Sequence, residues 1–148
     1  MTVFIAFLHH LAAFTLTASL VVELVLLQQE FNRATAKTLQ LVDGIYGMSA
    51  GLILALGALR VIYFEKGAAY YLHNGPFLSK MALFVVVGLI SVYPTVVFMR
   101  WRKTLKQGGV PAFSAQQRQR IKGILTLELI GIAGILLNAA MMAKGVQF

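Results

Sequence analysis

The sequence predicts an all-α integral membrane protein: a four-helix transmembrane bundle that forms a single domain over residues 1–148. Two observations lead to this prediction. Apolar residues make up 59% of the chain and charged residues only 12%, which leaves too little polar surface for a soluble domain of this length. In addition, four apolar stretches reach the roughly 20 residues that a helix needs to cross a bilayer core of about 30 Å.

The first two spans are predicted over residues 3–27 and 45–64. The first has no Lys or Arg ahead of it, unlike a secretory signal peptide, so we expect a retained span. The polar stretch 28–40 is interpreted as a short interfacial helix, followed by a turn at Asp43 and Gly44 in which Asp43 caps the second span. Small residues recur along one face of that span and favour close helix contact. They are Gly44, Gly47, Gly51, Ala55 and Ala58.

The other two spans are predicted over residues 76–99 and 121–143. Pro76 suits the first turn of a helix, where its missing N–H is not needed. With four spans, both termini lie on the same side, and the distribution of Lys and Arg indicates which side that is. The first and third connections carry Arg33, Lys37, Arg100, Arg102, Lys103, Lys106, Arg118, Arg120 and Lys122. The opposite side has only Lys66 and Lys144 outside the spans, so both termini are predicted to be periplasmic in a bacterial inner membrane.

Composition also excludes several functional classes. The Lys and Arg residues that give the net charge of +8 lie beside apolar spans. This position indicates a role in membrane topology rather than in nucleic-acid binding. The chain has no cysteine, which excludes disulfides, thiolate zinc sites, Cys-ligated iron–sulfur clusters and thioether-linked haem.

Ionisable residues inside the spans form an outer and an inner layer. The outer layer contains His9, His10, Arg60 and Lys80, and Glu65 is the only acid on that side. Charged residues in a span are costly, about 2.5–3.5 kcal/mol each on insertion scales. The excess of cations has two interpretations: Arg60 and Lys80 extend to lipid phosphates, or an anionic ligand lies between them.

Histidine favours the ligand interpretation. His9 lies on a seam of small and polar residues in the first span and is expected to face the bundle. Haem b would use an imidazole on iron and cations against its propionates, so we predict a pocket of His9, Arg60 and Lys80 with Tyr71 and His73 nearby. The second axial ligand would be His73, or alternatively Met141 or Met142. The alternative interpretations are a solvated loop histidine and lipid-facing methionines.

The inner layer consists of Glu23, Asp43 and Glu128. Buried carboxyl groups can carry protons across part of a membrane. The alternative, which we favour here, is that Glu23 and Glu128 pair with Arg or Lys of the basic loops. Trp101, beside these loops, is interpreted as an interfacial aromatic residue.

Several segments resemble a family of bacterial predicted membrane proteins of unknown function. They are Leu8-His9, DGIYG at 43–47, RVIYFEKG at 60–67, residues 71–80, SVYPT at 91–95 and Arg100-Trp101. A more distant similarity is to the small four-helix membrane protoporphyrinogen oxidases, which bind haem b. His9 and Lys80 occupy the places of that family's first-span His and third-span Lys, but Pro76-Phe77 stands where those enzymes have a tryptophan. This likeness implies a haem site and leaves the substrate open.

These observations lead to two main functional hypotheses. The first is an inner-membrane protein that binds haem b for a redox role, with a quinone or a porphyrin as its partner. If such a protein is an enzyme, it is a haem-dependent membrane oxidoreductase. The second is a cofactor-free accessory or assembly subunit, or a small transporter, that acts through helix contacts in a homo-oligomer or a larger membrane complex. A third alternative is a quinone- or lipid-handling protein whose outer cations hold a headgroup.

Overall fold

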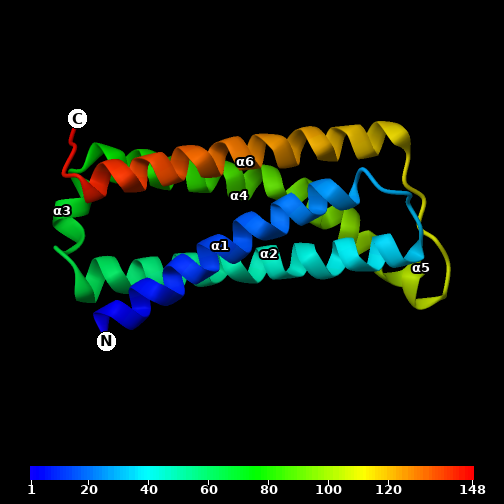
Figure 1. Cartoon of the computed structure of the whole chain (residues 1–148), viewed down its shortest axis with the longest axis horizontal. Helices are drawn as coiled ribbons and strands as arrows, with labels where there is room; N and C mark the ends of the chain where they lie inside the picture. Colours follow the sequence, from blue (N-terminus) through cyan, green and yellow to red (C-terminus); the bar gives the residue numbers. More distant parts are fainter.

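The computed structural model describes all 148 residues and consists of helices joined by short connections (Figure 1). The four long helices are α1 (Thr2–Leu26), α2 (Arg33–Leu59), α4 (Gly75–Arg100) and α6 (Ala115–Ala143). The shorter elements are the π-helical turn η1 (Arg60–Phe64), which continues α2, and the helices α3 (Ala68–Leu72) and α5 (Arg102–Lys106). The structure is all-helical, as predicted, and it contains four helical segments that are long and apolar enough to cross a membrane, which matches the number of predicted spans.

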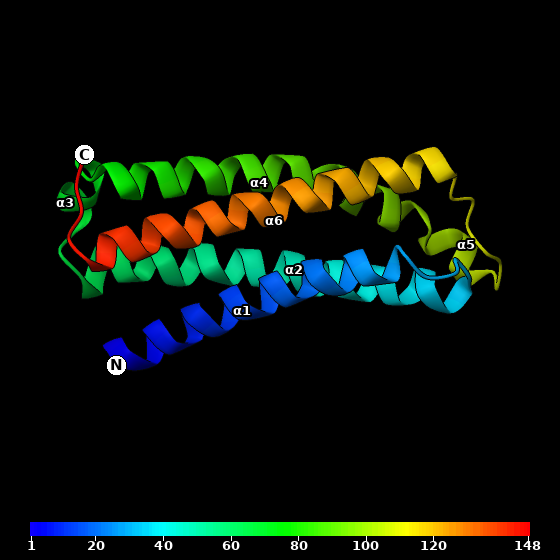
Figure 2. The same ribbon diagram turned by 45° about the horizontal axis from the view of Figure 1, so that its top comes forward.

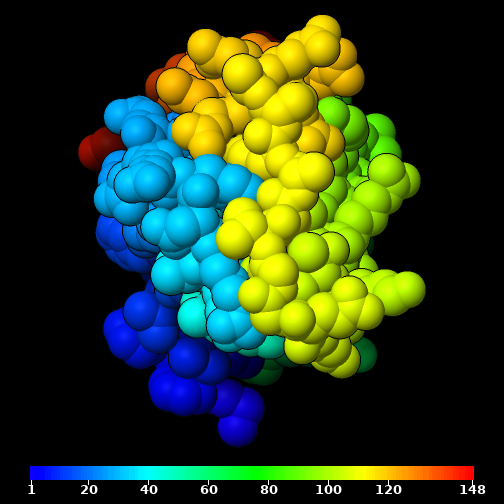
Figure 3. All heavy atoms as spheres, turned by 90° about the vertical axis from the view of Figure 1, so that its right-hand side faces the viewer, coloured from blue at the N-terminus to red at the C-terminus, as the bar shows by residue number.

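The long helices lie side by side in two closely packed pairs. Helix α1 packs along α2 and α4 along α6, while contacts of α1 with α6 and of α2 with α4 join the pairs (Figures 1 and 2). One end of the bundle, called the terminal end below, carries both chain termini and α3. The other, called the basic end, carries residues 27–32, α5 and residues 107–114. In Figure 3 these connections lie across the end of the bundle.

Side-chain caps define where three long helices begin. The first N–H groups of a helix have no partner within it, and an Asn or Ser oxygen just before the helix can accept from one of them. The caps are Asn32 for Thr35 N–H, Asn74 for Phe77 N–H and Ser114 for Gln117 N–H, at 2.9, 2.9 and 3.1 Å. Helix α4 begins at Gly75, next to the predicted start at Pro76.

Helix α2 begins ten residues before the predicted cap. Asn32 caps it, and the helix continues through Asp43 and Gly44 to Leu59. The predicted turn at these two residues, and the separate interfacial helix before it, are therefore wrong. A glycine inside a helix costs only about 1 kcal/mol relative to alanine, so an Asp-Gly pair does not interrupt a helix that packs along its whole length.

The apolar core is concentrated toward the basic end. Trp101 is only 5% exposed there, so its interpretation as an interfacial residue is wrong. Its ring packs against those of Phe31, Phe98 and Phe113, with centroids 5.2, 5.1 and 5.0 Å away. Toward the terminal end α1 runs away from α4 and α6 while it keeps contact with η1, and its first residues are exposed (Figure 2). The two ends of the bundle are therefore packed to different degrees.

The contact between α4 and α6 depends on a glycine. A Cβ atom at Gly131 would lie 2.4 Å from Cγ2 of Val87, whereas one at Gly123, on the same helix, would meet nothing within 4 Å. We expect Gly131→Leu to destabilise the bundle by about 1–3 kcal/mol or more, because valine has little rotamer freedom with which to yield.

Thermal unfolding of the detergent-solubilised protein measures this effect, with Gly123→Leu as the matched control. Equal melting temperatures for the two variants would contradict the α4–α6 packing described here.

Candidate functional site

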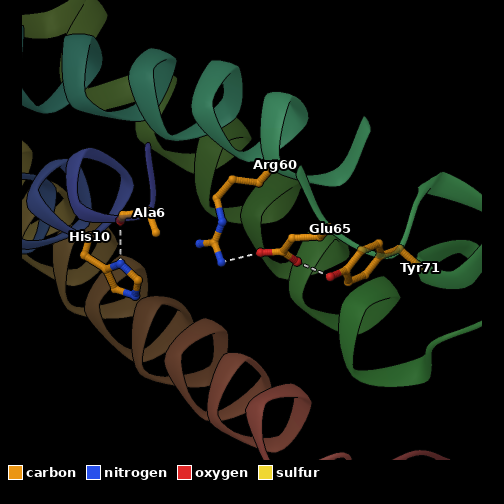
Figure 4. A network of polar contacts seen from close by, with 5 residues as sticks. All are labelled: Ala6, His10, Arg60, Glu65 and Tyr71. Carbon is orange, nitrogen blue, oxygen red and sulfur yellow. Dashed lines mark hydrogen bonds and ion pairs between the residues drawn. The ribbon is translucent and has the colours of Figure 1, made fainter. Parts of the chain in front are cut away.

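Three residues of the terminal end form a polar network. Arg60 lies in η1, Glu65 follows this turn directly, and Tyr71 lies in α3. The Arg60 guanidinium donates to Oε1 of Glu65, and the Tyr71 hydroxyl donates to Oε2 of the same carboxylate (Figure 4). Arg60–Glu65 is the chain's only ion pair. Glu65 therefore holds η1 and α3 together through both of its oxygens.

The electrostatics of Glu65 and Tyr71 follow from this network. Partial burial by itself raises the pKa of Glu65, but the hydrogen bond from Tyr71 and the charge of Arg60 outweigh it, so the pKa lies below its usual value. Burial and the bond to the Glu65 carboxylate raise the pKa of Tyr71 to about 12. At neutral pH the carboxylate is thus ionised and the phenol keeps its proton.

This network corrects one prediction. The two interpretations of the excess of cations placed Arg60 against a lipid phosphate or an anionic ligand, but in the structure Arg60 pairs with Glu65. Glu65 was noted as the only acid on its side, yet its central place was missed. Arg60 is five residues before it and Tyr71 six residues after it, across a bend that helical periodicity does not describe. Only the fold of this connection brings the three side chains together.

His9 and Lys80 lie near this network. The His9 ring packs beside Gly57 of α2, where a Cβ atom would lie 3.4 Å from its Cε1 atom. Its Nδ1 atom is buried without a hydrogen-bond partner. The charges of Arg60 and Lys80 both act on this ring, so the three predicted residues do lie close together. Nζ of Lys80 lies 5.5 Å from the centre of the Phe77 ring and forms no ion pair.

His73, one candidate for the second iron ligand, forms no side-chain hydrogen bond or ion pair with this group. It is exposed, and its Nδ1 atom lies 2.8 Å from the carbonyl oxygen of Ala69. No hydrogen bond, ion pair or ring contact joins it to His9. His10 is also exposed, and its ring lies against the carbonyl oxygen of Ala6, as Figure 4 shows. The cluster of His9, Arg60, Glu65, Tyr71 and Lys80 is called the terminal cluster below.

The terminal cluster fits haem b only in part. The buried Nδ1 atom of His9 has no hydrogen-bond partner and Lys80 has no ion-pair partner, as expected of an iron ligand and a propionate partner before binding. Arg60, in contrast, already has a carboxylate, which a propionate would have to displace. Haem b therefore requires a rearrangement of the Arg60–Glu65 pair.

A second polar group lies inside the bundle. Glu23 of α1 and Glu128 of α6 are 1% and 0% exposed, and none of their carboxyl oxygens has a hydrogen-bond partner. Asp43 of α2 accepts a 2.9 Å hydrogen bond from the Thr95 hydroxyl of α4. The expected pairing of Glu23 and Glu128 with the basic loops is wrong, because neither forms an ion pair. Asp43 lies inside α2 and caps no helix.

Two hollows open at the basic end. One is bounded by the start of the connection after α1, by Phe113 of the 107–114 connection and by the first turns of α6, and its lining includes Leu27, Arg118 and Lys122. The other is bounded by cations of α2 and α5, together with Gln40 and Leu105. Both lie at the opposite end of the bundle from the terminal cluster.

Comparison with known proteins supports the membrane assignment. No curated protein and no solved structure matches the sequence, and no comparison supports the similarity to the protoporphyrinogen oxidases. Residues 1–147 match the family model described as "Predicted membrane protein (DUF2214)". Since this match covers nearly the whole chain and the structure contains four candidate membrane helices, the chain belongs to the DUF2214 family of predicted membrane proteins.

Proposed function

We propose that this protein binds an amphiphilic, negatively charged cofactor at the terminal cluster, and that this cofactor is haem b in a redox role. The observation that carries the proposal is the unpartnered, buried Nδ1 atom of His9 in a ring on which two cations act. An imidazole nitrogen without a partner in an apolar setting is costly unless a ligand or a water completes its bonding.

Each member of the cluster has a distinct role in this proposal. His9 would bind iron through a ring nitrogen, and Lys80 would neutralise a propionate. Arg60 would release Glu65 and neutralise the other propionate in its place. Tyr71 would keep Glu65 hydrogen-bonded near the site. Bound haem would supply one-electron transfer, and a quinone or porphyrin dissolved in the bilayer would be the partner. His73 is not needed, because it lies outside the cluster.

We also propose that the protein lies in a bacterial inner membrane with both termini periplasmic. The support is the distribution of cations. The basic end carries nine Lys and Arg residues in its connections and helix ends, whereas the terminal end has only two outside the spans, Lys66 and Lys144. Positive connections face the cytoplasm in most membrane proteins. In this orientation the terminal cluster lies on the periplasmic side.

A different observation favours a second candidate function, that of an accessory subunit or small transporter which associates through helix contacts. The small-residue face of α2, formed by Gly44, Gly47, Gly51, Ala55 and Ala58, is exposed throughout. A Cβ atom at any of its three glycines would meet nothing within 4 Å. The face is therefore unused within one chain, and such faces let a second transmembrane helix approach closely.

The haem proposal predicts an optical signature. Protein expressed with ample haem should show a Soret band, and the visible α and β bands of the haem should sharpen on reduction with dithionite. His9→Ala should lose the band, and Lys80→Gln should reduce haem occupancy several-fold, because a propionate then lacks its cation. His10→Ala is the matched control, since this neighbouring ring is exposed and should leave the spectrum unchanged. Wild-type protein without a Soret band would exclude haem b.

The orientation predicts an accessibility pattern. Because the chain contains no cysteine, single cysteines can be introduced and labelled without background. Gln147→Cys, at the terminal end, should react with a membrane-impermeant maleimide in intact spheroplasts. Gln107→Cys, at the basic end, should react only after the membrane is opened. The reverse pattern would refute periplasmic termini.

The second candidate predicts that the exposed face of α2 is needed for association. Gly47→Leu combined with Gly51→Leu should reduce the oligomer fraction measured by crosslinking in membranes by several-fold. The control is Gly88→Leu, because Gly88 of α4 is also exposed and also has open space around it. Equal crosslinking in all three proteins would remove this candidate.

A further inference from the structure

All four long helices contribute to a polar site deep in the bundle, apart from the terminal cluster. Glu23 comes from α1, Asp43 from α2, Thr95 from α4 and Glu128 from α6. The three acids are 1%, 8% and 0% exposed. They lie close enough that the charges of Asp43 and Glu128 act on Glu23. The Tyr46 hydroxyl of α2 faces Glu128 but leaves its carboxyl oxygens without a hydrogen bond.

Nothing positively charged balances these acids. The only ion pair in the chain is Arg60–Glu65 at the terminal end, and no Lys, Arg or His acts on Glu23 or Glu128. The titratable groups that face this site are therefore Asp43 and Tyr46 from α2, together with the two glutamates themselves. Helix α4 adds only the hydroxyls of Ser91 and Thr95.

An ionised carboxylate in this position would be strongly unfavourable. Isolated buried charges cost several kcal/mol or more, and a second nearby carboxylate adds repulsion. A bound cation or a proton relieves both effects. No group of three Asp, Glu, His or Cys residues lies close enough together to hold a metal ion, which favours a proton over a metal. A proton needs only one carboxyl oxygen, and each glutamate has two oxygens without partners.

We propose that Glu23 and Glu128 form a proton-binding site inside the membrane that exchanges protons with the basic end. Each carboxylate takes up one proton from water to become a neutral carboxylic acid, and each returns it by the reverse step. Glu23 lies in the last turn of α1, about 5 Å along the helix axis from the end of α1 that faces the basic end, so this is the shorter route to water. This proposal does not require haem to bind at the terminal cluster.

Infrared difference spectroscopy tests this proposal on the whole protein in detergent or nanodiscs. The wild type at neutral pH should show the C=O stretching band of a protonated carboxylic acid, and this band should shift when the protein is transferred to D₂O. Glu23→Gln and Glu128→Gln should each remove one component, and the double variant should remove both. Glu30→Gln is the control, because Glu30 is exposed in the connection after α1.

Either of two results would overturn the proposal. The first is a neutral-pH spectrum without a protonated-acid band, or with a band that both single variants leave intact. The second is a band that does not shift in D₂O, because the site would then be sealed from water. If one variant fails to fold, the other still tests the assignment, since each glutamate contributes its own component. Gln keeps the shape of a neutral Glu, so we expect both variants to fold.

Discussion

The membrane leaves a polar side chain three options, and most of this structure follows from them. Hydrocarbon offers no hydrogen bonds, so a polar group must pair inside the bundle, lie at one of its ends, or stay neutral. Asp43 and Thr95 take the first option, and the cations of the connections take the second. The proton-binding proposal assigns the third option to Glu23 and Glu128, whose buried carboxyl oxygens have no hydrogen-bond partner. Buried polar groups that lack a partner are therefore the candidates for a functional role.

The polar groups of the terminal cluster pair with one another and also lie at an end of the bundle. Glu65 accepts from both Arg60 and Tyr71, so the connection between α2 and α4 is closed by one carboxylate. A ligand with carboxylate groups would compete with Glu65 for Arg60 but would find Lys80 without an ion-pair partner. Arg60 could then pair either with such a ligand or with Glu65, but not fully with both. With the proposed ligand, this exchange would give the cluster two states, one with Arg60 paired to Glu65 and one with Arg60 paired to the ligand.

The uneven packing of the bundle separates its structural and functional parts. Toward the basic end, Trp101 and its three aromatic neighbours fill the space between the helices and leave little freedom. Toward the terminal end, α1 runs away from α4 and α6, and His9 meets α2 beside a glycine. The exposed face of Gly47 and Gly51 is a third feature that the isolated chain does not use. The aromatic core thus lies toward one end, and the surfaces of the two proposed functions lie outside it.

Much of the candidate site could be predicted from residue types and helical spacing. The proximity of His9, Arg60 and Lys80 was predicted, because each lies a few residues from the same end of an apolar span and the spans must run side by side. The role of Glu65 could not be predicted, because it depends on how residues 65–67 turn the chain from η1 to α3. His73 was predicted to approach the cluster, but its ring turns to its own backbone instead.

The sequence by itself determined the class of the protein, because the length and apolar character of a membrane span are local properties that each stretch of chain carries alone. It did not determine where α2 begins, since Asp43 and Gly44 have the residue types of a turn and only packing along α1 favours a continuous helix there. The tertiary structure also decided that Glu23 and Glu128 lie away from every cation. That depends on how four helices rotate about their axes, which no single stretch of sequence specifies.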